Sequence, residues 1–183
     1  MTNRDMWDST TMDVIPLNAQ IVAGYPHAYP TDYGRFPHAL QVKIDQHGNH
    51  ADDCHVADGE TGAIGIATMR QWVESWHLLH PYGLMAVNGY FDVPTVYFSL
   101  NNMKAYMAAL VGLVYDVWVA SWGVGPTVIP GTSLHQYENE ALTGIHADRT
   151  IVYDPTWGVR PLPAPLDPVL RSEVVAYINA HLT

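Results

Sequence analysis

Two carboxylates lie two residues apart in the segment Val56-Ala57-Asp58-Gly59-Glu60. The aliphatic residues before them predict a short strand that ends in a turn. Side chains two apart on a strand share a face, so Asp58 and Glu60 should project together from its carboxyl end. Such a pair suits glycosidic cleavage, in which one protonated acid assists the leaving oxygen and one carboxylate stabilises positive charge at the sugar carbon. Burial and mutual repulsion would separate their two pKa values in this sense.

Further candidates lie near the ends of other β-rich runs, where they would converge on the mouth of a barrel. The acidic and polar candidates are Asp8, Asp45, Gln136, Tyr137, Glu138 and Asp148. The aromatic rings that could stack on a sugar are Tyr25, Tyr97, Trp118 and Trp122. Taken singly, an acid at such a position more often caps a turn, and an aromatic ring more often packs in the core. The hypothesis therefore depends on their convergence.

The segment from Asp45 to His55 is rich in metal-binding residue types. It holds His47, His50 and His55 together with Cys54 and three aspartates, which covers every ligand type of a zinc site. Its spacing matches no two-pair zinc pattern, and its glycine, asparagine and aspartates equally suit a turn. A metal-dependent hydrolase and a pH-sensitive surface are the alternatives to a plain loop. The sequence favours the loop, and we expect no metal and no cofactor.

Short β-rich runs separated by helical or loop segments are typical of βα units. The pattern predicts an α/β fold, a small (βα)8 TIM-type barrel. Because 183 residues is below the usual size of this fold, some helices should be short or absent, and an incomplete barrel is the alternative. The eight runs are Met6 to Thr10, Ile21 to Tyr25, Val42 to Asp45, His55 to Asp58, Thr95 to Ser99, Val117 to Trp122, Leu134 to Tyr137 and Thr150 to Asp154.

Apolar residues at three- and four-residue intervals predict two helices that cover the sheet, from Met69 to Leu79 and from Met103 to Val114. Residues 1–160 should form the barrel domain. Residues 161–183 should form a proline-rich connection and an amphipathic helix, with Asp167 as its N-cap and Pro168 at its first position. We expect this helix to pack on the barrel; docking of a partner or self-association is the alternative.

Charge and cysteine content exclude several classes of protein. The net charge is -10, and no Lys/Arg cluster is present, so nucleic acid is not an expected partner. Cys54 is the single cysteine, which rules out an intramolecular disulfide. The apolar stretch from Ala108 to Trp122 is interrupted by Asp116 and is too short to span a membrane. The first residues lack the apolar core of a secretory signal, so we expect synthesis in a host cytoplasm.

Seven short motifs occur in the order seen in lysozyme-like glycoside hydrolases. The chain resembles the glycoside-hydrolase-like domains of endolysins and other phage proteins of actinobacteria, which are similar to family-25 muramidases. The resemblance covers roughly residues 6–157. Its motifs are Asp8-Ser9-Thr10, Val22-Ala23-Gly24-Tyr25, Asp58-Gly59-Glu60, Pro94-Thr95-Val96-Tyr97, Val117-Trp118-Val119-Ala120-Ser121-Trp122, His135-Gln136-Tyr137 and Asp148-Arg149-Thr150-Ile151-Val152-Tyr153.

The resemblance implies a muramidase that hydrolyses the β-1,4 bond between N-acetylmuramic acid and N-acetylglucosamine of peptidoglycan. It implies Glu60 as general acid. Asp58 would stabilise charge or orient the substrate N-acetyl group, and Asp8 would line the same pocket. The resemblance implies that Asp148, Gln136 and Tyr137 bind the substrate. We expect the aromatic candidates Tyr25, Tyr97, Trp118 and Trp122 to bind it as well.

Two features depart from the family pattern. Gly59 stands where the family often has a larger aliphatic residue, and a glycine loosens the backbone between the acids. The stretch from His80 to Val93 is longer than usual, and we expect an insertion beside the active-site mouth. The alternative function is a non-catalytic virion structural or wall-binding module on the same fold. The expected partner is cell-wall glycan, met after release from the host or as part of a virion with other virion proteins.

Overall fold

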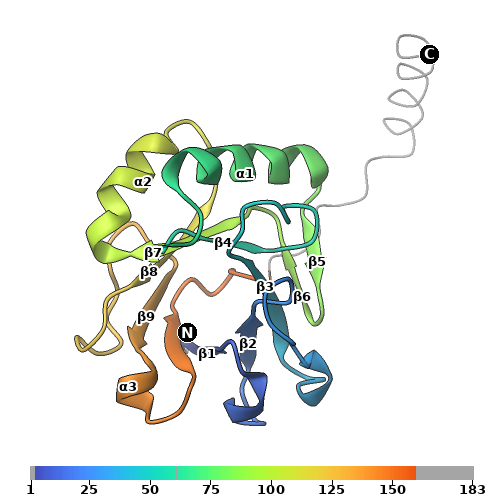
Figure 1. Ribbon diagram of the computed structural model, residues 1–183, viewed down its shortest axis with the longest axis vertical. Helices are drawn as coiled ribbons and strands as arrows, with labels where there is room; N and C mark the ends of the chain where they lie inside the picture. The colour runs from blue at the N-terminus through green and yellow to red at the C-terminus, as the bar shows by residue number, and fades with distance from the viewer. Residues whose placement is uncertain (1–2, 61, 160–183) are drawn as a thin grey trace, which may run out of the picture.

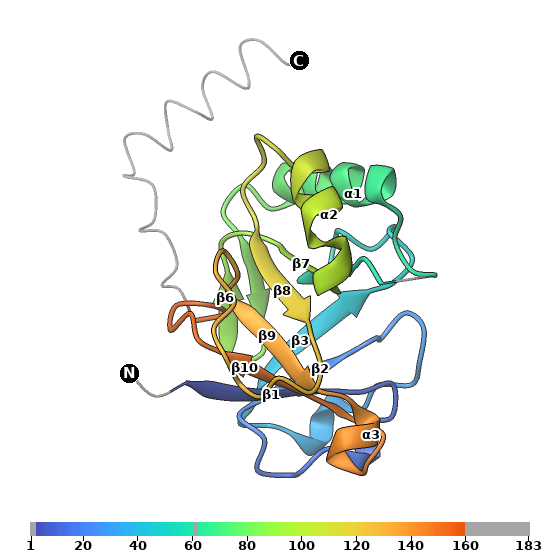
Figure 2. The same ribbon diagram turned by 90° about the vertical axis from the view of Figure 1, so that its left-hand side faces the viewer.

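The computed structural model describes residues 3–60 and 62–159, which form a closed barrel of eight strands (Figures 1 and 2). Each of the eight β-rich runs expected from the sequence overlaps one barrel strand, so their positions are confirmed. The strands are, in the order in which they pair, β1 (Arg4–Asp8), β10 (Asp148–Val152), β9 (Leu134–Glu138), β8 (Asp116–Ala120), β7 (Thr95–Ser99), β4 (Val56–Asp58), β3 (Leu40–Asp45) and β2 (Ile21–Gly24), which pairs again with β1.

The predicted (βα)8 TIM-type barrel is wrong, because the barrel is mixed and mostly β. Strand β10 runs antiparallel to both β1 and β9, whereas the other six pairs are parallel. Only residues 139–147 separate β9 from β10, too few for the crossover that a parallel pair requires. The described residues contain three α-helices, α1 (Ile66–Leu79), α2 (Met103–Ala109) and α3 (Glu140–Thr143), and three 3-10 turns, η1 (Met12–Val14), η2 (Tyr33–Arg35) and η3 (Leu100–Asn102).

Helices α1 and α2 lie side by side outside the barrel, over β4, β7 and β8 (Figures 1 and 2). The apolar face of α1 is buried as its spacing predicts from Met69 to Trp76, whereas Leu79 at the end of the helix is 55% exposed. Trp76 Nε1 donates to the Cys54 carbonyl at 3.0 Å. Helix α2 is shorter than predicted, because it ends at Ala109 and not at Val114. Gly112 adopts a φ of 86°, which is not a helical conformation. The predicted C-terminal helix lies outside the described residues. None of the described helices has the length and apolarity to cross a membrane.

The hairpin of β5 (Leu84–Ala86) and β6 (Gly89–Phe91) is formed by the stretch that was expected to be an insertion beside the mouth. It packs instead near the start of β3, where Asn88 Nδ2 donates to the Ala39 carbonyl at 2.8 Å. The Gln41 amide donates to the Val87 carbonyl at 3.1 Å. The acids lie at the opposite ends of these parallel strands, so the hairpin does not border them.

The barrel interior is apolar at its centre and polar toward the carboxyl ends of the parallel strands. Met6, Val42 and Val56 are fully buried inside it. The Trp118 ring is also fully buried, lies 4.3 Å from the Tyr97 ring and donates through Nε1 to Thr150 Oγ1 at 3.2 Å. Trp118 thus forms the floor of the mouth, and the polar residues of the mouth lie above its ring.

Gly59 follows β4 directly and lies under α2. A Cβ at this position would stand 2.9 Å from Tyr106 Cζ and 3.0 Å from Met69 Cε. The Tyr106 ring cannot simply move away, because its hydroxyl donates to the Ile64 carbonyl at 2.7 Å. Glycine is therefore required here by a close approach, and it permits dense packing beside the acids instead of loosening them.

We expect Gly59→Ala to lower the free energy of unfolding by about 1–3 kcal/mol through overpacking against Tyr106. The matched control is Gly65→Ala, where the added Cβ meets no atom within 4 Å. Gly65 is the N-cap of α1, so this control should cost less than about 1 kcal/mol. Urea unfolding of both variants measures the difference, and equal costs would contradict the packing role of Gly59.

Candidate functional site

The turn after β4 positions Glu60. The Asp58 carboxylate accepts a hydrogen bond from the Glu60 amide at 2.8 Å, and the Gly59 amide donates to the Tyr97 carbonyl at 2.7 Å. The Ile64 amide closes the turn by donating to the Asp58 carbonyl at 2.9 Å. These bonds hold the Glu60 side chain so that its Oε1 lies 2.9 Å from the Tyr97 hydroxyl, inside the mouth of the barrel.

Gln136 on β9 connects the residues of the mouth. Trp122 Nε1 can only donate, and it lies 3.1 Å from Gln136 Oε1, so this oxygen is the acceptor. The Gln136 Nε2 group must then face the acids. It lies 3.3 Å from both oxygens of Asp8 and 3.1 Å from Asp148 Oδ2. The Tyr97 hydroxyl lies 2.5 Å from Gln136 Oε1, which extends the network to Glu60.

Burial raises the pKa values of three acids near the mouth, Asp8, Asp58 and Asp148. Desolvation and the neighbouring Asp148 charge raise the pKa of Asp8 well above its usual value, although Gln136 opposes this by donating a hydrogen bond. Burial raises the pKa of Asp58 to about 7 against the hydrogen bond from the Glu60 amide. Burial likewise raises the pKa of Asp148 to about 6. Buried acids whose pKa values are raised in this way and that lie close together are typical of catalytic sites.

A pocket of about 350 Å³ opens beside Asp8 and Asp148, whereas Asp58 and Glu60 are not among the residues that line it. Trp122, with 47% of its surface exposed, and Tyr25 contribute aromatic walls. Asn139 Oδ1 is buried without a hydrogen-bond partner and is a free acceptor at the pocket. The lining residues are Asp8, Ser9, Thr10, Tyr25, Trp122, Asn139, Glu140, His146, Ala147 and Asp148.

Six of the lining residues were not predicted as site residues from the sequence: Ser9, Thr10, Asn139, Glu140, His146 and Ala147. Ser9 Oγ donates to the His146 carbonyl, and His146 Nδ1 lies 2.8 Å from Glu140 Oε2. Ser9 and Asn139 directly follow β1 and β9, so their position one residue beyond a strand end was the available signal.

The structure brings together most of the candidates, including all three proposed catalytic residues. Two proposed substrate-binding residues lie elsewhere. Trp118 is buried beneath Tyr97, and Tyr137 points out of the barrel, with the Arg149 guanidinium 5.6 Å from its ring centre. The candidates that meet at the mouth are Asp8, Asp58, Glu60, Tyr25, Tyr97, Trp122, Gln136 and Asp148.

Two further acids near strand ends serve structural contacts outside the mouth. Asp45 accepts hydrogen bonds from the amides of His47 and His50 and from Trp72 Nε1. Glu138 forms an ion pair with Arg149 at 3.7 Å. Asp45 therefore shapes the loop after β3, and Glu138 stabilises the outer face of the sheet.

The three histidines of the Asp45 to His55 segment do not converge on one point. His55 is buried and accepts a hydrogen bond on Nδ1 from the Lys43 amide at 3.0 Å, and burial lowers its pKa to about 4. His47 is exposed. A metal site made of His47, His50 and His55 is not formed.

Comparisons with known proteins assign the chain to no family. No protein-family model matches the chain, and no curated protein matches it. One solved structure, the Mycobacterium tuberculosis Tat-secreted protein Rv2525c in complex with HEPES, is similar over 85% of this chain and 98% of its own. The identity is 15% and the TM-score is 0.41, and at this TM-score the likeness supports no inference about function.

The raised pKa of Asp58 predicts a pH-dependent stability. The folded-state pKa of about 7 lies above the unfolded value near 3.9, so the folded state binds more protons. The stability that Asp58 contributes is fully present below about pH 4 and is lost as the pH rises through 7. We therefore expect the free energy of unfolding of Asp58→Asn to rise by roughly 4 kcal/mol relative to that of the native chain between pH 4 and pH 8.

Urea unfolding at several pH values measures this difference. Asp52→Asn, which alters an exposed acid, is the control and should follow the native pH dependence. If the free energies of unfolding of the native chain and of Asp58→Asn changed with pH in parallel, Asp58 would not titrate in this range.

Proposed function

We propose that the chain is a glycoside hydrolase that cleaves the β-1,4 bond between N-acetylmuramic acid and N-acetylglucosamine, with Glu60 as general acid. The observation that supports it best is the contact of Glu60 with Tyr97 and, through Gln136, with the pocket acids Asp8 and Asp148. Glycosidic cleavage needs a pair of carboxyl groups, and this network joins Glu60 to two others. Cell-wall glycan as the substrate rests on the motif order that resembles family-25 muramidases.

The contacts of Glu60 support it as the general acid. The Tyr97 hydroxyl lies close to two oxygens, Glu60 Oε1 at 2.9 Å and Gln136 Oε1 at 2.5 Å, and its one hydrogen can be donated to either. These contacts hold the Glu60 carboxyl group beside Gln136. A general acid must be held in this way to reach the atom that it protonates.

We assign the other acids different roles within this proposal. Asp58 is only 5% exposed and holds the Glu60 amide, so it positions the general acid. Asp148 is half-buried and lines the pocket, and with a pKa of about 6 it is ionised at neutral pH. Asp148 is therefore the carboxylate that would stabilise positive charge on the sugar ring. This differs from the family resemblance, which implies Asp58 for that role.

The walls of the pocket supply contacts that a sugar requires. The exposed Trp122 ring offers a flat apolar face, and Tyr25 contributes a second aromatic surface. The unpaired Asn139 Oδ1 could accept a hydrogen bond from a hydroxyl or an N-acetyl amide. Trp122 also orients Gln136, so a sugar stacked on it would lie next to the acids.

Turbidity clearing and zymography on purified actinobacterial cell walls test the proposal. We expect the native chain to release reducing sugar and Glu60→Gln to do so at least about 100-fold more slowly, because the substitution removes the transferable proton. Glu74→Gln, an exposed glutamate on α1 paired with Arg70, is the matched control and should retain native activity.

Two outcomes would contradict the proposal in different ways. Undiminished activity of Glu60→Gln would exclude Glu60 as the acid. Sedimentation of the native chain with the walls but no release of reducing sugar would instead favour a non-catalytic wall-binding or virion module.

A further inference from the structure

We infer that the chain binds a divalent transition metal of the zinc type on the outer side of the barrel, through His27, His50 and Asp53. One ligand atom from each of these residues lies within 4.8 Å of the other two. Within residues 3–60 and 62–159, no other three His, Cys, Asp or Glu donors come as close together. The acids of the mouth therefore do not form a comparable cluster.

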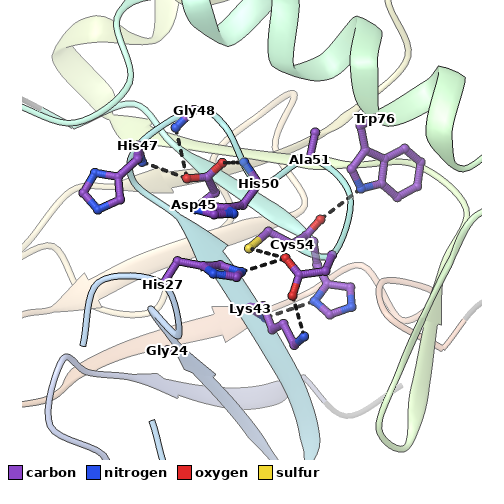
Figure 3. A network of polar contacts seen from close by, with 12 residues as sticks. Gly24, His27, Lys43, Asp45, His47, Gly48, His50, Ala51, Cys54 and Trp76 are labelled. Atoms are coloured by element: carbon purple, nitrogen blue, oxygen red, sulfur yellow. Dashed lines mark hydrogen bonds and ion pairs between the residues drawn. The ribbon is translucent and has the colours of Figure 1, made fainter. Parts of the chain in front are cut away.

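The backbone brings these residues together from two loops. His27 lies in the turn after β2, in which the amides of Ala28 and Tyr29 donate to the Tyr25 carbonyl. His50 lies in the loop between β3 and β4, where its amide donates to Asp45 Oδ2 at 2.7 Å. Figure 3 shows the two segments meeting beside β3. The backbone of the two loops is thus held by hydrogen bonds that do not use the ligand atoms of the two histidines.

Asp53 is prepared to act as an anionic ligand. Its Oδ2 pairs with Lys43 Nζ at 2.8 Å, and its Oδ1 lies 2.7 Å from His27 Nε2. Lys43 and His27 thus hold both oxygens of the carboxylate in place beside the two histidines. A metal would replace the hydrogen bond between Asp53 and His27, and these two side chains would move apart to admit the ion.

The two imidazoles lie next to each other without another polar partner between them. The rings of His27 and His50 stack with their centres 3.6 Å apart and their planes at 5° (Figure 3). The His27 side chain is 30% exposed, so its ring can turn its nitrogen toward the ion. The two rings and the Asp53 carboxylate thus gather two nitrogen donors and one oxygen donor within 4.8 Å of one another, and a ring that turns can aim its nitrogen at a shared ion.

The donor set selects the class of ion. Two imidazole nitrogens and one carboxylate oxygen suit Zn²⁺, Co²⁺, Ni²⁺ or Cu²⁺, whereas Mg²⁺ and Ca²⁺ prefer oxygen ligands. The bound ion would join the loop after β2 to the loop after β3. Since Tyr25 stands two residues before His27 and lines the pocket, the ion would also fix one wall of the candidate active site. The inference does not depend on glycoside hydrolysis.

Isothermal titration of the metal-stripped full chain with ZnCl2 tests the site, and Co²⁺ absorption provides a second readout. We expect one equivalent to bind, and His27→Ala and His50→Ala each to weaken binding at least about tenfold. His47→Ala, which removes an exposed histidine of the same loop, is the matched control and should bind as the native chain does. MgCl2 should not compete.

Absence of stoichiometric Zn²⁺ binding, or undiminished binding by both His27→Ala and His50→Ala, would overturn the inference. Equal weakening by His47→Ala would place the ion elsewhere in the loop and would also overturn it. His27 is exposed, so its substitution leaves the core intact; circular dichroism confirms that each variant is folded. Glu60→Gln should bind Zn²⁺ normally, which separates this site from the mouth.

Discussion

Strand β10 closes the barrel between β9 and β1, and its register places Asp148 directly opposite Asp8 and Thr150 opposite Gln136. Two acids that face each other across neighbouring strands repel, and burial adds to the cost of ionising them. The Gln136 amide donates toward both acids, and Trp122 determines which way that amide points. Closure of the barrel and the chemistry of its mouth therefore depend on the same group of contacts.

The second part of the mouth depends on β4 and its contact with α2. Asp58 is buried at the strand end, and its carboxylate holds the amide of Glu60. Tyr106 packs over Gly59 without room for a further carbon atom. The chain keeps a buried acid here, although a neutral residue would be more stable at neutral pH. Such a cost is common where a residue is retained for function.

The proposed metal site and the mouth of the barrel share the loop after β2. Tyr25 borders the pocket, and His27 lies in the turn that Tyr25 begins. An ion held by His27, His50 and Asp53 would reduce the mobility of this turn and of the loop between β3 and β4. The proposed metal site and the proposed catalytic site thus share no residue, but they are connected through the same loop.

Local pattern in the sequence was sufficient to locate all eight barrel strands, the helix α1 and the acids at strand ends, because burial imposes periods of two and 3.6 residues on the chain itself. It could not determine that β10 runs antiparallel, since strand direction depends on which partners close the barrel. Nor could it separate Trp118 from Trp122, which lie four residues apart: one forms the floor and the other an exposed wall.

The partner of His50 was also beyond the reach of local pattern. His27 lies in a different loop, and the segment around His50 already held nearer histidines that the fold turns away. The sequence by itself thus determined which residues alternate toward the core and which acids end the strands. The tertiary structure alone decided how deep each side chain lies and which distant groups meet, because depth and contact depend on strand register and on closure of the barrel.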